Sequence, residues 1–450
     1  MKLSHLSFLI CLLASSSIAS AADFDSDKFR NWHQWRGPEA SGVSRDANPP
    51  VTWGPNSNIR WKTAIDGRGS STPIIWGHRI FLLTSVNTGK VDPTLPKPED
   101  QPQRPFGIKY PNTEYEFIVV CLDRRTGREL WKRTAARRIP HEGHHGDNNF
   151  ASASPVTDGQ RLYAWFGMAG IFCYDFKGEL LWKRDLGQVS VRRSFAEASS
   201  PVVHDGRVII NRDHEGQSYI AVLDAETGKD VWRAERDEPS TWMTPLVVEH
   251  NGTTQVVTSA SNRVRSYDLE TGKVIWECGG QVFNVTPSPV TDGSHVFCMS
   301  GYQGSSGMAI SLDSRGDVTD SNAVAWKVNR GTPYVPSPVL YNGRLYFNQS
   351  NNAILSSVDS RTGEIQIERT RMPGLSRVYA SPIAAAGRIY YVGRSGATLV
   401  LKAGDHFEVL ATNELGEPVD ASPAAVDEEL FLRGSRHLFC IRADANSATE

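Results

Sequence analysis

Residues 154–166, "SPVTDGQRLYAWF", decide the fold because their pattern returns along the chain. A Ser/Thr-Pro pair opens a short apolar run, a turn that usually contains Gly follows, and a second apolar run completes the unit. Such runs around a Gly-containing turn are typical of two short antiparallel strands. The unit occurs eight times, with Pro73, Pro155, Pro201, Pro245, Pro289, Pro338, Pro382 and Pro423. Successive prolines lie 82, 46, 44, 44, 49, 44 and 41 residues apart, so only the first interval is anomalous.

A second unit follows the first in most repeats. It reads "LDRRTGRELW" at 122–131, "YDFKGELLW" at 174–182, "LDAETGKDVW" at 223–232, "YDLETGKVIW" at 267–276 and "VDSRTGEIQI" at 358–367, with a looser version at 313–326. The Asp carboxylate can accept turn N–H groups, and Gly takes the positive-φ position. The terminal Trp is a large apolar plate suited to packing between sheets.

Four short antiparallel strands per repeat, with a period near 44, predict an all-β propeller of eight blades. The last repeat ends after three strands, at 436–442, and "NIRWKTAI" (58–65) matches the outer strand "ELLWKRDL" of another repeat. We therefore expect the N-terminal strand to complete the last blade and remove an open sheet edge. The alternative is two separate β domains, but no linker interrupts the repeats.

These repeats resemble the pyrroloquinoline-quinone-type (PQQ-like) family of eight-bladed propellers over residues 58–442. The leader "WHQWRGPEASGVS" (32–44) also resembles a segment that opens many secreted members. The resemblance implies two kinds of relative: quinone-dependent alcohol and sugar dehydrogenases, and non-enzymatic scaffolds such as the outer-membrane barrel-assembly lipoprotein (BamB). It specifies the fold and leaves the function open.

Composition and the chain ends predict the location. A formal net charge of −2 on 450 residues argues against nucleic-acid binding, which needs a basic excess. Residues 1–22 read as a cleavable signal peptide, and no later stretch is long and apolar enough to span a membrane. We expect a periplasmic or extracellular monomer with a leader at 23–57, a propeller at 58–442 and a tail at 443–450. Cysteines lie mostly in apolar runs, and their spacing demands no zinc site or disulfide.

Four antiparallel strands per blade place every loop between strands two and three, and every connection between blades, on one face. That face collects the Pro-rich insertion 86–116, the connection 133–150 and the loops 212–218 and 300–306. Long loops on a rigid scaffold are common binding sites, so we predict that this face is functional. Residues just before the Ser/Thr-Pro pairs should ring the channel mouth: Arg68, Phe150, Glu197, Trp242, Asn284, Tyr334, Arg377, Tyr379 and Asp420. They suit a polar, planar or extended ligand; the alternative is that they line a water-filled channel or pack together.

The stretch "GHHGDNNF" (143–150) lies in one of these connections. His141, His144, His145 and Asp147, with His214 from a neighbouring loop, could chelate a divalent ion. Adjacent histidines on an extended chain point apart, however, and the alternative is that they are solvated or pin the loop. We therefore assign no metal.

Three functions remain open. The leading interpretation is an exported, non-catalytic scaffold or binding module for an envelope protein segment, a glycan or another ligand. A PQQ- and calcium-dependent dehydrogenase is the first alternative, but the sequence has no adjacent cysteines and no CxxCH haem motif, and no calcium set can be assigned. A polysaccharide hydrolase or lyase using Glu197 and Asp420 is the second; their separation would decide it. No catalytic residue or cofactor is assigned.

Overall fold

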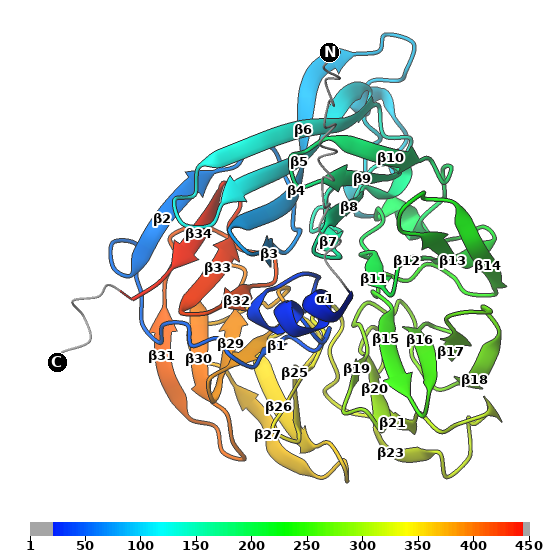
Figure 1. The fold of residues 1–450 in the computed structure, drawn as a ribbon, viewed down its shortest axis with the longest axis vertical. Helices are drawn as coiled ribbons and strands as arrows, with labels where there is room; N and C mark the ends of the chain where they lie inside the picture. The colour runs from blue at the N-terminus through cyan, green and yellow to red at the C-terminus, as the bar shows by residue number, and fades with distance from the viewer. Residues whose placement is uncertain (1–20, 444–450) are drawn as a thin grey trace, which may run out of the picture.

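Each repeat folds into one sheet of antiparallel strands, and eight sheets surround a common centre (Figure 1). The protein is thus an eight-bladed β-propeller, as the repeats predict. This computed structural model describes residues 21–443. Most of the predicted signal peptide and of the C-terminal tail lies outside the described residues.

The sheets are numbered here as blades 1–8 in chain order, each from its inner to its outer strand. Blades 1–4 consist of β3 (Ile74–Trp76), β4 (Arg79–Val91), β5 (Thr113–Asp123) and β6 (Glu129–Arg138); β7 (Val156–Thr157), β8 (Arg161–Trp165), β9 (Ile171–Asp175) and β10 (Leu180–Arg184); β11 (Val202–His204), β12 (Arg207–Arg212), β13 (Ser218–Asp224) and β14 (Asp230–Arg236); and β15 (Leu246–His250), β16 (Thr253–Ser259), β17 (Val264–Asp268) and β18 (Val274–Cys278). A short strand from the next blade, β22 (Gly316–Asp317), adds parallel to β18.

Blades 5–8 consist of β19 (Val290–Thr291), β20 (His295–Ser300), β21 (Ser306–Ser311) and β23 (Val324–Val328); β24 (Val339–Tyr341), β25 (Arg344–Asn348), β26 (Ile354–Asp359) and β27 (Ile365–Arg371); β28 (Ile383–Ala385), β29 (Arg388–Val392), β30 (Thr398–Lys402) and β31 (Val409–Asn413); and β32 (Ala424–Val426), β33 (Glu429–Arg433), β34 (His437–Ile441) and β2 (Ile59–Ala64). In blade 8, β2 pairs antiparallel with β34, so a segment from the start of the propeller supplies the outer strand of its last sheet.

The Ser/Thr-Pro pairs form a hydrogen-bonded belt around the channel. In each link, the backbone N–H of one Ser or Thr donates to the side-chain hydroxyl of its counterpart in the next blade, at 2.8–3.0 Å. The belt runs through Thr72, Ser154, Ser200, Thr244, Ser288, Ser337, Ser381 and Ser422. Because these N–H groups are buried, each needs a partner, and the neighbouring hydroxyl supplies it.

The outer-strand tryptophans form a second set of contacts between blades. The indole of Trp182 lies on Gly228 of the next blade, where an added Cβ would come within 2.6 Å of the ring. Its Nε1 donates to the Ala225 carbonyl at 3.0 Å. Trp61, Trp131, Trp232 and Trp326 make the same pair of contacts with their neighbours. The Gly of the "TG" turn therefore serves two purposes: it takes a positive φ and leaves room for an indole.

Blades 8 and 1 are held together by additional polar contacts. Arg433 of β33 is buried and donates from one guanidinium nitrogen to the Ser71 hydroxyl and the Leu83 carbonyl of blade 1, both at 2.6 Å. On the outside, Trp61 of β2 donates to the Arg124 carbonyl at 2.9 Å. The ends of the chain thus meet at a joint that is tied from the channel to the rim.

The leader closes the channel on the face opposite the long loops. Its strand β1 (Val43–Ser44) pairs parallel with the inner strand β28, and Trp32 is fully buried beside β3. The Arg36 guanidinium is buried and donates to the carbonyls of Ser41, Pro338 and Pro382. Burial lowers the pKa of Arg36 to about 9. The helix α1 (Ala21–Asp27) lies at the centre of this face (Figure 1).

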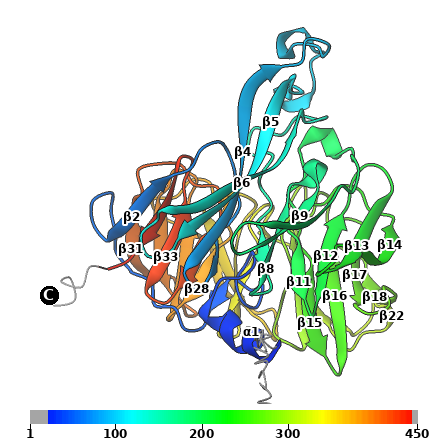
Figure 2. The same ribbon diagram turned by 45° about the horizontal axis from the view of Figure 1, so that its top comes forward.

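The Pro-rich insertion forms an arm on the other face. The hairpin of β4 and β5 extends beyond its blade, on the side away from α1 (Figure 2). Because pairing continues as far as Val91 and Thr113, the irregular part is confined to residues 92–112, a shorter stretch than the predicted loop 86–116. The connection predicted at 133–150 likewise begins only after Arg138, the end of β6.

The belt gives a first prediction. Ser337→Ala removes the hydroxyl that accepts the buried N–H of Ser288, so the free energy of unfolding should fall by about 1–3 kcal/mol. Urea denaturation of the full chain measures this change. Ser294→Ala, on an exposed turn, is the control and should change stability by less than about 0.5 kcal/mol. Equal effects of the two substitutions would contradict a stabilising belt.

The indole contacts give a second prediction. Gly228 and Gly206 both have a φ of 68°, but an added Cβ would meet Trp182 only at Gly228 and nothing within 4 Å at Gly206. Gly206→Ala should therefore cost only the strain of a left-handed residue, about 1–2 kcal/mol. Gly228→Ala should cost about 1–3 kcal/mol more through overpacking. Thermal and urea unfolding of both variants measure the difference, and equal losses would disprove the packing role.

Candidate functional site

A hollow of about 430 Å³ lies on the long-loop face, where the connections between blades converge. Of the nine residues predicted to ring the mouth, the structure brings five together in its lining: Trp242, Tyr334, Arg377, Tyr379 and Asp420. This hollow is called the mouth pocket below. Because its lining comes from connections all around the ring, the propeller body fixes the relative positions of these side chains.

The other four predicted residues lie outside the mouth pocket. Arg68 and Phe150 line a neighbouring hollow of about 350 Å³. Glu197 accepts a hydrogen bond from the buried Arg212 guanidinium at 2.9 Å. Asn284 is only 3% exposed. The hydrolase alternative requires Glu197 and Asp420 to face one common cavity. Asp420 lines the mouth pocket and Glu197 does not.

An ionic network crosses the mouth. Asp147, in the connection between blades 1 and 2, accepts hydrogen bonds from the Tyr379 hydroxyl and from Arg394 Nη1, each at 2.7 Å. Arg394 also binds both Asp420 oxygens, at 2.6 and 3.0 Å. Arg377 donates to the Tyr379 hydroxyl at 2.7 Å and lies 3.7 Å from Asp147. The network ties the early connection to blades 7 and 8.

The network fixes the protonation of its members. Burial opposes ionisation of Asp147, but the hydrogen bonds from Tyr379 and Arg394 outweigh it and lower the pKa of this carboxyl. Burial and the bond to Asp147 raise the pKa of Tyr379 to about 12. At neutral pH, Asp147 is therefore an acceptor and Tyr379 a donor, and neither is poised to transfer a proton.

Aromatic rings form much of the remaining wall. Phe195 lies 6.2 Å from Trp242 between ring centres, and Tyr302 lies 4.8 Å from Tyr334. The indole of Trp242 is held by a hydrogen bond from its Nε1 to the Ala196 carbonyl, at 2.8 Å. Phe106, in the irregular part of the arm, lines the pocket and packs edge-on against His145.

The histidines of the opening connection hold loops in place. His141 Nε2 lies 2.9 Å from the Val189 carbonyl, and His144 Nδ1 lies 2.8 Å from the His145 carbonyl. His145 Nδ1 accepts the Asp147 N–H, and His214 Nδ1 accepts the Gly216 N–H. Burial lowers the pKa of both His144 and His214. Within residues 21–443, no three His, Cys, Asp or Glu side chains are arranged to hold a metal.

Several residues of the pocket lining and of the ionic network behind it are not identified from the sequence. Arg394, the centre of the network, lies in the loop between β29 and β30, and Asn351 lies in the loop between β25 and β26. Both loops belong to the face that the strand parity selects, so the same rule applied to short loops would have found them. Phe106 and Tyr302 lie in the loops 86–116 and 300–306, which the sequence assigns to this face without singling out individual residues, and Phe195 lies in the connection between blades 2 and 3.

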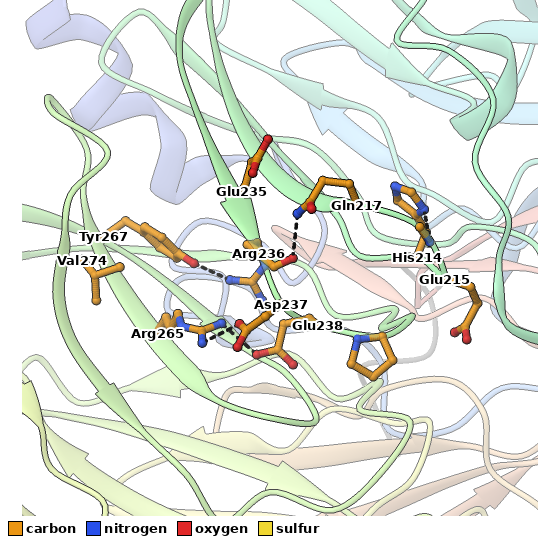
Figure 3. A pocket seen from close by; sticks show the side chains of 12 residues that line it. His214, Glu215, Gln217, Glu235, Arg236, Asp237, Glu238, Arg265, Tyr267 and Val274 are labelled. Carbon is orange, nitrogen blue, oxygen red and sulfur yellow. Dashed lines mark hydrogen bonds and ion pairs between the residues drawn. The ribbon is translucent and has the colours of Figure 1, made fainter.

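A second hollow, of about 650 Å³, lies beside blades 3 and 4 (Figure 3). The Arg236–Asp213 ion pair beside it is fully buried at 2.7 Å, and Arg265 binds Asp237 and Glu238 at 2.6 and 2.9 Å. Burial raises the pKa of Glu238 to about 7. These charges join β14 to β17, and charged side chains dominate the lining, whereas aromatic rings form much of the wall of the mouth pocket, which is therefore the stronger candidate site.

Solved structures with the same fold have different activities. BamB from Moraxella catarrhalis is 10% identical, with a TM-score of 0.55 over 86% of this chain and 98% of that one. A quinohemoprotein alcohol dehydrogenase from Pseudomonas putida is 12% identical, with a TM-score of 0.54 over 94% and 82% of the two chains. A europium-containing methanol dehydrogenase is 10% identical, with a TM-score of 0.56 over 93% and 92%. At such identities the likeness establishes the fold alone.

Sequence comparison identifies the family, which the structural matches do not. No curated protein gives a significant match. Within residues 21–443, no helix has the length and apolar character needed to cross a membrane. The model of a PQQ-repeat family, described as outer membrane protein assembly factor BamB, matches residues 116–366, more than half of the chain. By this match and by its eight four-stranded blades, the protein belongs to that family of PQQ-like repeat propellers.

Proposed function

We propose that this protein is an exported, non-catalytic binding module of the cell envelope, with its ligand site in the mouth pocket. The observation that carries the proposal is the pairing of charges there. Asp147 and Asp420 both bind Arg394, so the carboxylates that face the pocket are held as ion-pair acceptors. A preformed pocket with aromatic walls and paired charges is suited to recognition.

The family supports the envelope location. Its description as an outer membrane assembly factor, together with the predicted signal peptide, favours a periplasmic or extracellular protein. An envelope protein or a glycan is the expected partner, and the near-neutral net charge gives nucleic acid no electrostatic attraction. We expect the chain to act as a monomer.

The mouth pocket does not fit the quinone of the dehydrogenase alternative. That quinone carries three carboxylates, whereas Arg377 and Arg394 already face Asp147, and Arg394 also holds Asp420. Among residues 21–443, no cluster of three acidic or other metal-ligating side chains offers a calcium site. No reaction step is therefore assigned to this group.

A retention experiment tests the proposal. The immobilised full chain should retain a component of envelope extract, and Trp242→Ala should weaken that retention about tenfold by removing one wall of the pocket. Phe29→Ala is the matched control, because Phe29 belongs to the leader on the opposite face, where it contacts Lys28 and Arg45. Equal retention by all three proteins, analysed as protein and carbohydrate fractions, would refute a mouth-pocket ligand.

A second measurement addresses the dehydrogenase alternative. Calorimetry with the quinone and calcium should show no saturable binding, and alcohols or sugars should then reduce no electron-accepting dye. The physical reason is that Asp147 and Asp420 balance the positive charges of Arg377 and Arg394, so the pocket offers an anionic ligand no net positive charge. Dye reduction that requires both the quinone and calcium would overturn the non-catalytic assignment.

A further inference from the structure

We infer that the mouth pocket recognises an uncharged carbohydrate, either a free sugar or the end of a glycan. This inference rests on the proposed binding function and specifies the ligand of that site. It follows from three features of the pocket: partly exposed aromatic rings, hydrogen-bonding groups of both kinds, and a balanced charge.

The ring faces are the first feature. Trp242, Tyr302, Tyr334 and Tyr379 are half-buried, so each presents part of its surface to the pocket. An aromatic face is electron-rich and attracts polarised C–H groups. The face of a pyranose ring presents a patch of such C–H groups, whereas its edge presents hydroxyls. A sugar can therefore stack on these rings while its hydroxyls point toward other groups.

Donors and acceptors are the second feature. Asn351 uses its Oδ1 to accept the Val335 N–H, and its Nδ2 has no hydrogen-bond partner among residues 21–443. Arg377 is 54% exposed and uses one nitrogen for the Tyr379 hydroxyl. Among the residues that the structure describes, Asp420 accepts hydrogen bonds only from Arg394, and it retains further lone pairs. Since a sugar hydroxyl both donates and accepts, a wall with both kinds of group suits neighbouring hydroxyls.

Charge balance is the third feature. Arg377 and Arg394 carry two positive charges, and Asp147 and Asp420 carry two negative charges, all within one network. A charged ligand would have to compete with one of these pairs, and an unpaired charge in a partly buried site is costly. The balance favours a ligand without carboxylate, phosphate or ammonium groups, and so disfavours both acidic glycans and charged peptides.

The size and shape of the mouth pocket favour the end of a glycan over its middle. Its volume of about 430 Å³ lies near the lower end of the range for small-molecule sites, about 300–1,000 Å³. On the opposite face the leader lies over the centre of the ring, with α1 at the middle (Figure 1). A glycan therefore enters from one side only and places its terminal units in the pocket.

The test is calorimetry and array binding of the full chain with neutral and acidic sugars. The neutral probes are maltose, cellobiose, N,N′-diacetylchitobiose and their hexasaccharides; digalacturonic acid is the acidic probe. At least one neutral probe should bind, and digalacturonic acid should bind at least tenfold more weakly. The disaccharides and hexasaccharides separate a free sugar from a glycan end as the source.

Variants connect binding to the pocket. Trp242→Ala and Tyr334→Ala should each weaken binding of the neutral probe by about tenfold, whereas Tyr334→Phe, which keeps the ring, should weaken it less. Phe29→Ala should bind like the unaltered chain. Circular dichroism identifies a variant that fails to fold. If one alanine variant does so, binding by the other alanine variant tests the pocket.

Two results would overturn the inference. If no neutral probe binds, or if the acidic probe binds more tightly, the ligand is not an uncharged carbohydrate. The retention experiment then decides the fate of the proposed function: retention that still depends on Trp242 points to another ligand class in the same pocket. Retention that is unchanged by Trp242→Ala refutes the pocket as a binding site altogether.

Discussion

The fold depends on one recurring hydrogen bond, which runs from the buried N–H that precedes an inner-strand proline to a hydroxyl in the next blade and links blades 1 to 8 in order. Inner strands of neighbouring blades do not pair as a sheet, so their first backbone groups would otherwise be buried without partners. The hydroxyl of a Ser or Thr at this position accepts the N–H of the preceding blade, and its own N–H donates to the hydroxyl of the following blade. The proline that follows has no N–H to satisfy and starts the strand in an extended conformation. The dipeptide is therefore a joint between blades as well as the start of a strand.

The joint between the last and first blades uses different chemistry. The Thr72 hydroxyl has no hydrogen-bond partner among residues 21–443, and the belt is open at that point. Arg433 and the strand β2 bring the two blades together instead. The leader adds contacts to blades 6 and 7 through Arg36. Closure of the ring thus uses contacts from both ends of the chain, whereas the other joints use the repeated Ser/Thr-Pro pair.

The repeat pattern was sufficient to predict the blades, because the same strand-and-turn pattern occurs eight times in the sequence. It also indicated the face that carries the long loops and five of the residues that line the mouth pocket, since strand parity applies to every blade. The failures have a common cause. Glu197 faces the buried Arg212 instead of the mouth, and Asp147 reaches across to Arg394, more than 240 positions away. Side-chain pairings between loops have no period, so spacing along the chain does not reveal them.

The contacts of the leader impose an order on folding. Arg36 binds carbonyls of Pro338 and Pro382, and β2 pairs with β34, so the first part of the chain to be made needs partners from the last. Contacts so distant in sequence slow folding, because a long loop must close before they form. Arg36 and β2 cannot make these contacts until the later blades have been synthesised. These contacts of the early segment therefore form late, and the ring is joined only when its last blade is in place.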